Sequence, residues 1–129
     1  IRYIIDSGVD LECEDNRKWR PIHYICRYST PEMIRYIIDR GVDLECENNN
    51  KWRPIHCICR YSTFEMIRYI LNYNVQIDTQ ILKCDGVDCN YTCHDLIKFN
   101  PNLNADEKQL LIKLFDDYVI INIKEPDNQ

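Results

Sequence analysis

The strongest constraint on the fold is a 33-residue unit that occurs twice in direct succession. Ile1–Met33 and Ile34–Met66 align without a gap and differ at five of 33 positions. The segment Lys-Trp-Arg-Pro-Ile-His therefore appears at residues 18–23 and again at residues 51–56. A third copy begins at Ile67 and loses its match after Asp78. A fixed period of this length is typical of stacked supersecondary units, so the chain is expected to form a solenoid.

Each unit is expected to begin with a short extended arm. Val9–Asn16 alternates apolar and acidic residues, and this period of two indicates extended backbone. Asp15-Asn16 favours a turn at the tip of the arm. Ile1–Ser7, before the arm, has the apolar spacing of a helix and is followed by Gly8. This start in the middle of a unit predicts that the chain is a piece of a longer array.

Two helices are expected after each arm. Pro21 suits the first turn of a short helix that ends near Tyr28. Ser29 and Glu32 have the spacing of a capping box, which predicts a second helix over about Thr30–Arg40. The apolar stripe of this second helix consists of Met33, Ile34, Ile37 and Ile38. The second copy repeats the pattern, with Ser62 and Glu65 as the capping pair and Gly41 ending the previous helix.

The third unit departs from the period in its arm. Thr79–Asp88 contains Asp85-Gly86, a dipeptide typical of tight hairpin turns, so an enlarged arm is expected here. Thr92–Phe99 then has the pattern of a short first helix. Its inward side chains are expected to be Cys93, Leu96 and Ile97.

The C-terminal part is expected to close the stack. Asn104 and Glu107 predict a capped helix over Ala105–Tyr118. Its predicted apolar stripe consists of Leu110, Leu111, Leu114 and Phe115. A polar outer face, as a terminal repeat requires, would come from Asp106, Lys108, Lys113, Asp116 and Asp117. Val119–Ile123 is interpreted as an apolar segment that docks on this helix, and Lys124–Gln129 as a loose tail.

The repeated unit resembles the ankyrin repeat, whose hallmark is Thr-Pro-Leu-His followed by small residues. The corresponding segments are Arg-Pro-Ile-His-Tyr-Ile-Cys at 20–26 and Arg-Pro-Ile-His-Cys-Ile-Cys at 53–59. The family's Gly-Ala-Asp-Val close corresponds to Gly-Val-Asp-Leu at 41–44. The resemblance covers residues 1–78. It implies helix pairs, projecting arms and a concave face that binds proteins.

Three positions depart from the family pattern in both copies. Lysine replaces the glycine before the motif, arginine replaces the motif threonine, and serine replaces the glycine between the helices. The replacements are Lys18 and Lys51, Arg20 and Arg53, and Ser29 and Ser62. The geometry of the turns at these positions is therefore a question for the structure.

Composition narrows the class of protein and its partners. The formal net charge is −5, with −1 over residues 1–78 and −4 over residues 79–129, which argues against general nucleic-acid binding. No stretch approaches the roughly 20 apolar residues that span a bilayer, and no secretory signal is visible. Four of the eight cysteines recur at equivalent repeat positions, which favours small apolar core residues. Free thiols in a reducing, cytoplasmic compartment are expected.

Two groups of residues raise the question of chemistry. His23 and His56 are possible bases or metal ligands, but they occupy the family's structural histidine position. The resemblance implies that each forms a hydrogen bond between neighbouring loops. Cys84, Cys89 and Cys93 with His94 are possible zinc ligands, although adjacent Cys93 and His94 make tetrahedral geometry awkward. The alternative is that these are ordinary thiols, and neither a metal nor a cofactor is expected.

A repeated strip of cationic and aromatic residues is the candidate partner-binding site. The resemblance places it along the arms and first helices, and Trp, Tyr and Arg are enriched at binding hot spots. The strip comprises Lys18, Trp19, Arg20, Tyr24, Arg27, Tyr28, Lys51, Trp52, Arg53, Arg60 and Tyr61. Internal packing is the alternative, with Trp19 against Trp52 and with Arg27 or Arg60 paired to acidic residues of the arms. Those acidic residues are Glu12, Glu14, Glu45 and Glu47.

The sequence thus predicts an all-α ankyrin-type solenoid with short hairpin-like arms. Repeats are expected over residues 1–78, with an incoming helix at 1–8 and units at about 15–47 and 48–78. Residues 79–129 are expected to form an enlarged arm, a degenerate capping repeat and a tail. The predicted function is non-catalytic, monomeric protein binding to a partner of acidic character. A spacer role within a longer array, or a zinc or thiol module around residues 84–94, is the alternative.

Overall fold

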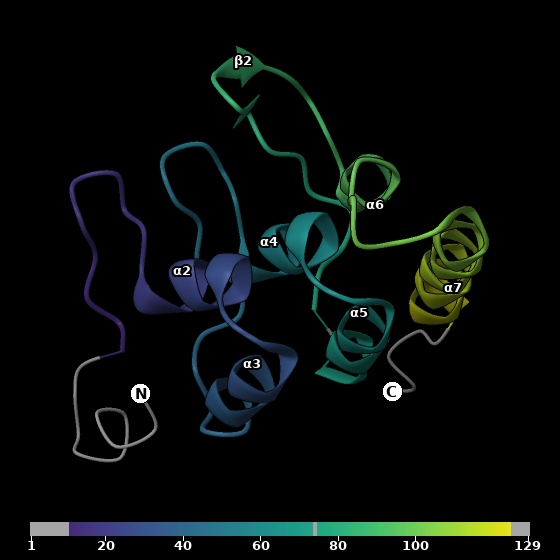
Figure 1. Ribbon diagram of the computed structural model, residues 1–129, viewed down its shortest axis with the longest axis horizontal. Helices are drawn as coiled ribbons and strands as arrows, with labels where there is room; N and C mark the ends of the chain where they lie inside the picture. The colour runs from purple at the N-terminus through teal and green to yellow at the C-terminus, as the bar shows by residue number, and fades with distance from the viewer. Residues whose placement is uncertain (1–10, 74, 125–129) are drawn as a thin grey trace.

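The computed structural model describes residues 11–73 and 75–124, with side chains described as far as Tyr118. The helices form two rows, and loops project from one side of the stack (Figure 1). The inner row consists of α2 (Pro21–Tyr28), α4 (Pro54–Tyr61) and α6 (Cys93–Lys98). The outer row consists of α3 (Pro31–Ile38), α5 (Phe64–Ile70) and α7 (Ala105–Lys124). The predicted helix over Ile1–Ser7 and the residues after Lys124 lie outside the described part.

Two of the three inner helices, α2 and α4, begin at a proline, as the sequence predicts. Pro21 and Pro54 occupy the first turn of α2 and α4, where the missing N–H group costs no helical hydrogen bond. The preceding Arg20 and Arg53 keep extended backbone and act as N-caps. The replacement of the family's threonine by arginine therefore leaves the helix start intact.

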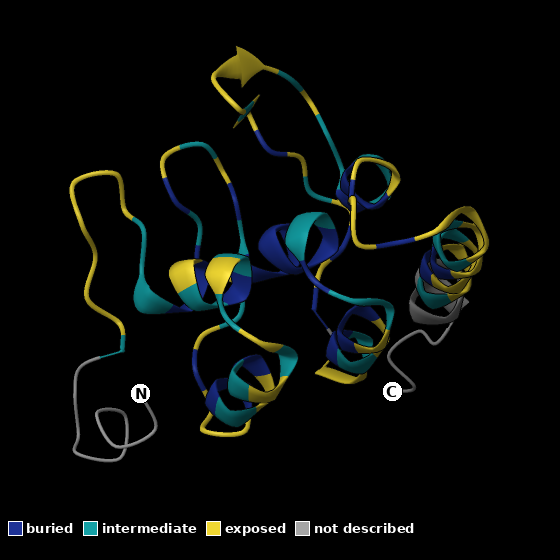
Figure 2. Ribbon diagram, viewed as in Figure 1, coloured by how far each residue is buried: buried dark blue, intermediate teal, exposed yellow. Residues whose placement is uncertain are grey.

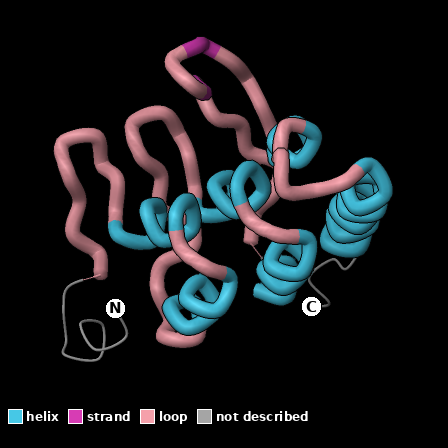
Figure 3. The backbone as a smooth tube through the Cα atoms, viewed as in Figure 1, coloured by secondary structure: helices cyan, strands magenta, loops and turns pink. Residues whose placement is uncertain are grey.

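The capping residues predicted for the outer helices are wrong. Thr30, one residue after the predicted Ser29, caps α3, because its Oγ1 accepts a hydrogen bond from the Met33 N–H group. Thr63 replaces the predicted Ser62 in the same way at α5. Ser29 and Ser62 are instead the C-caps of α2 and α4. Short loops follow these two helices (Figure 3). The φ values of the two serines are −98° and −100°, so this turn does not require glycine.

The core lies between the rows, and α4 is its most enclosed element (Figure 2). Helix α4 packs between α2 and α6, which buries every residue from Pro54 to Cys59. The predicted inward residues of α6, namely Cys93, Leu96 and Ile97, are fully buried. Five cysteines are also buried, and the described residues contain no disulfide. Burial raises the pKa of the Cys57 thiol to about 12, so this sulfur behaves as a small apolar group.

The three arms differ in regularity but are linked to one another. In the first arm, the Lys18 N–H group donates to the Asp15 carbonyl at 2.9 Å and closes the turn. The third arm contains strands β1 (Lys83–Cys84) and β2 (Val87–Asp88), joined by the predicted Asp85-Gly86 turn. Both turn residues have positive φ, as a type I′ hairpin requires. Backbone bonds from Asn49 to Arg17 and from Leu82 to Asn50 connect the arms in series.

The C-terminal helix differs from its prediction in length and in exposure. Asn104 and Glu107 form the predicted reciprocal capping box at its start. However, α7 continues to Lys124, so Val119–Ile123 belongs to this helix and is not a separate docking segment. No glycine or proline occurs in that segment to end the helix earlier. Among the described residues, no helix is long and apolar enough to cross a membrane.

Only half of the predicted apolar stripe of α7 is in the core. Leu111 and Phe115 are fully buried, whereas Leu110 and Leu114 are 54% and 38% exposed. Leu111 and Phe115 face the stack. Leu110 and Leu114 each precede a buried residue by one position, so they lie on a neighbouring part of the helix surface. Packing on one side of α7 therefore covers a narrower stripe than the sequence pattern suggests.

The two lysines that replace the family's glycine have a left-handed backbone conformation, which predicts that glycine would be more stable there. Lys18 and Lys51 have φ values of 64° and 67°, a conformation that costs a side-chain-bearing residue about 1–2 kcal/mol. Lys51→Gly should therefore raise the free energy of unfolding by about 0.5–1 kcal/mol in urea denaturation, after the extra unfolded-state entropy of glycine is subtracted. Asn49→Gly, at an exposed position without positive φ, is the control and should give no increase. An equal effect of the two substitutions would contradict the argument.

Candidate binding surface

The repeated histidines connect the inner helices α2 and α4 to the arm that follows each of them. His23 Nδ1 accepts the Arg20 N–H group at 2.9 Å, so its proton lies on Nε2. Nε2 is 2.9 Å from the carbonyl oxygen of Trp52 in the second arm and 3.2 Å from that of Cys46. His56 repeats the pattern with the Arg53 N–H group and the carbonyl of Thr79. The inter-loop hydrogen bond implied by the family resemblance is therefore confirmed.

The environment of these imidazoles keeps them neutral. Burial lowers the pKa of His56 from 6.5 to about 4, and burial also lowers the pKa of His23. Both ring nitrogens of each histidine already have backbone partners. A buried, neutral and fully hydrogen-bonded imidazole acts as a structural cross-link, with no nitrogen left for a substrate or a metal.

Two of the predicted binding arginines are engaged by the acidic arms. Arg20 pairs with Glu12 at 2.9 Å, and it also contacts Glu14 and Asp43. Arg53 pairs in the same way with Glu45 and Glu47 at 2.9 and 3.1 Å. The prediction that Arg27 or Arg60 pairs with these glutamates is wrong, because the N-cap arginines occupy them. Lys51 also lies 3.5 Å from Glu47, whereas Lys18 lies in the turn of the first arm.

The two tryptophans of the repeats have different environments. Trp52 is only 7% exposed, and its indole N–H group donates to the Lys83 carbonyl at 2.8 Å in the third arm. Trp19 is half-buried and packs on Tyr24, with ring centroids 4.8 Å apart. The rings therefore pack on their own repeats rather than on each other. Trp52 offers little surface to a partner, whereas Trp19 lies beside solvent-exposed Tyr24.

The remaining strip residues form a continuous row on the inner helices. The Arg27 guanidinium lies over Tyr61 at 4.7 Å from the ring centroid, over Tyr28 at 5.1 Å and near Trp19 at 6.0 Å. Arg60 lies over the same Tyr61 ring at 4.8 Å. We call this set the aromatic–arginine row. Its members are Trp19, Tyr24, Arg27, Tyr28, Arg60 and Tyr61.

The row continues into residues that the sequence analysis missed. A shallow depression of about 330 Å³ lies between the end of α4, the third arm and the end of α6. It is lined by Arg60, Cys84, Asp85, Val87, Tyr91 and Phe99. Tyr91 and Phe99 pack with centroids 5.2 Å apart. The sequence did contain a signal for Phe99. An aromatic residue stands at the C-terminal end of all three inner helices, because Tyr28 and Tyr61 are the last residues of α2 and α4 and Phe99 directly follows α6.

The possible zinc ligands are not gathered at one point. Cys93 is buried in the core, and His94 Nε2 lies 2.9 Å from Asp116 on α7. Cys84 and Cys89 lie on the third arm. Within residues 11–73 and 75–124, no three His, Cys, Asp or Glu side chains are placed to hold a metal ion together.

Comparison with known proteins agrees with this architecture. A family model described as ankyrin repeats (3 copies) matches residues 1–81. A search of curated proteins found no match to the chain.

The histidine cross-links predict acid sensitivity. Because the pKa of His56 is about 4 in the native state and 6.5 when unfolded, the unfolded chain binds more protons between these pH values. The contribution of neutral His56 to the stability of the fold is complete above pH 6.5 and is lost as the pH falls toward 4. As the pH falls from 7 to 5, the titration of His56 alone should lower the free energy of unfolding by about 2 kcal/mol, as measured by urea denaturation. His56→Gln should show a smaller decrease over the same range. A native His56 that titrates by NMR near its ordinary value would contradict this.

The unequal burial of the aromatic residues predicts unequal costs of removing them. Trp52→Ala should lower the free energy of unfolding by about 3–5 kcal/mol, because it empties a core site and leaves the Lys83 carbonyl without its donor. Tyr28→Ala, at a residue that is 71% exposed, should change it by no more than about 0.5 kcal/mol. Thermal or urea denaturation measures both. Comparable losses would show that the exposed row is part of the core.

Proposed function

The chain belongs to the ankyrin repeat family, and on that premise we propose that its aromatic–arginine row and the adjoining depression bind a segment of a partner protein. Ankyrin repeats are generally protein–protein interaction modules, and the family is typically non-catalytic. The predicted site comprised the whole repeated strip. The proposed contact surface is narrower, because Trp52 is buried and the N-cap arginines are held by the arms.

One observation carries the proposal: a partly exposed set of aromatic rings and guanidinium groups extends from α2 to α4 and adjoins the depression beside Phe99. Tyr28, the most exposed large side chain of the row, is 71% exposed although the Arg27 guanidinium lies over its ring. Flat rings and stacked guanidinium groups lose little conformational entropy on binding, which suits hot-spot residues. The depression beside Phe99 adds a site into which an apolar side chain of the partner can insert.

The proposed partner has acidic character near the middle of this surface. Arg27 and Arg60 stack on aromatic rings, and no ion pair is formed by either in the described part of the chain. Arg20 and Arg53 differ, since arm carboxylates already compensate them. Complementary charge at such a surface mainly increases association rate and selects among partners. The charge preference therefore rests on Arg27 and Arg60 alone.

A comparative capture experiment tests the proposed function. The full chain, Tyr28→Ser/Arg60→Ser and a control, Arg35→Ser/Glu65→Ser, are immobilised after their melting temperatures are shown to agree. The control residues are exposed and lie on the outer helices α3 and α5. Quantitative mass spectrometry should show proteins that the wild type and the control retain and that the row variant loses by about tenfold or more. Capture by all three proteins alike, or by none, would favour the spacer role.

A further inference from the structure

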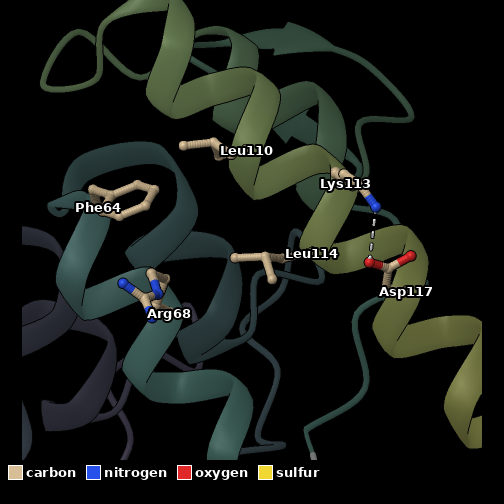
Figure 4. A pocket seen from close by; sticks show the side chains of 6 residues that line it. All are labelled: Phe64, Arg68, Leu110, Lys113, Leu114 and Asp117. Carbon is tan, nitrogen blue, oxygen red and sulfur yellow. Dashed lines mark hydrogen bonds and ion pairs between the residues drawn. The ribbon is translucent and has the colours of Figure 1, made fainter.

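A second candidate site lies on the opposite side of the stack, between the outer helices α5 and α7 (Figure 4). Phe64 and Arg68 extend from α5, and Leu110 and Leu114 extend toward them from α7. Lys113 and Asp117 complete the lining of a groove of about 360 Å³. The two leucines are the exposed half of the predicted α7 stripe. Half of the lining residues are therefore apolar, and Leu110 and Leu114 among them are side chains that the core does not use.

The equivalent space between the outer helices α3 and α5 provides a comparison for this groove. One repeat earlier, the corresponding space beside α5 and α3 is lined by polar side chains. These are Arg35, Glu65, Arg68, Tyr69 and Asn72. Pro31 also occupies the position that becomes Phe64 in the second copy. Stacking of outer helices thus does not require an apolar groove, and the apolar lining is specific to the α5–α7 side.

Among the described residues, one of the two cations that line the groove forms no ion pair. Lys113 and Asp117 pair with each other at 3.3 Å on the α7 wall. The Arg68 guanidinium lies over Phe64, 5.5 Å from the ring centroid, on the α5 wall. No carboxylate pairs with Arg68 among the contacts of the described residues. An apolar groove with one uncompensated guanidinium complements an apolar surface that carries an adjacent carboxylate.

We propose that this groove binds an amphipathic helix of a partner protein, with apolar residues against Phe64, Leu110 and Leu114 and a carboxylate against Arg68. The spacing supports a helical occupant, since Phe64 and Arg68, and likewise Leu110 and Leu114, are each one helical turn apart. Two walls with that spacing accept apolar side chains at i and i+4 of a third helix. This site uses none of the residues of the aromatic–arginine row, so it does not depend on the proposed function.

The test uses the full chain and two stapled amphipathic peptides of about 15 residues, long enough for a stable helix. The acidic peptide carries leucines at i, i+4 spacing flanked by glutamates, and the basic peptide carries lysines in place of the glutamates. Binding is measured by fluorescence anisotropy and by NMR shifts of the Leu110 and Leu114 methyl groups. The acidic peptide should bind, and Leu110→Ser/Leu114→Ser should weaken it by about tenfold or more. Arg68→Glu should weaken the acidic peptide and strengthen the basic one.

Arg35→Glu is the matched control, because this arginine lies on α3 beside the polar depression and should leave binding near the wild-type affinity. Four results would overturn the proposal. These are equal binding of both peptides, binding of neither, wild-type affinity in Leu110→Ser/Leu114→Ser, and a loss of affinity in Arg35→Glu that equals that of Arg68→Glu. Self-association of the wild type that the leucine variant abolishes would likewise overturn it, by assigning the groove to a second copy.

Discussion

The buried imidazole at the start of α2 and of α4 is the interaction on which the rest of the structure depends. His23 joins the N-terminus of α2 to the second arm through Trp52, and His56 joins α4 to the third arm through Thr79. Each ring satisfies one donor at a helix end and one acceptor in a loop, groups that are costly to bury without a partner. The two histidines therefore hold α2 and α4 to the arm of the following repeat.

Nearly identical copies nevertheless acquire different local chemistry. In the first copy the Tyr24 hydroxyl donates to Asp15 at 2.6 Å, and both residues are exposed. In the second copy Asn48 and Cys57 occupy these positions, and both are buried. Two of the five sequence differences therefore fall on a single contact. The Asn48 Nδ2 atom has no hydrogen-bond partner among the described residues. Asn48 and Cys57 therefore do not reproduce the side-chain hydrogen bond between Tyr24 and Asp15.

Sequence reasoning succeeded where a local rule has one outcome. Pro21 opens a helix because its fixed φ and missing N–H group suit only the first turn. Asp85-Gly86 forms the hairpin turn because both residues tolerate positive φ. The preference for serine or threonine as a helix N-cap did not decide between adjacent Ser29 and Thr30, because either residue can cap a helix. The observed helix register selects Thr30.

The sequence by itself determined the architecture: the 33-residue period, the Pro-Ile-His segment and the apolar spacing are local properties that specify stacked helix pairs. Only the tertiary structure decided which members of the repeated strip face solvent. Trp19 and Trp52 lie in the same repeated segment, but the enlarged third arm accepts a hydrogen bond from the indole N–H group of Trp52 and covers this residue. Arg53 differs from Arg60 because the carboxylates of Glu45 and Glu47 reach it, a local pairing that recurs at Arg20 in the first copy. Exposure, in contrast, depends on neighbours from other repeats, and a repeated segment cannot encode those neighbours on its own.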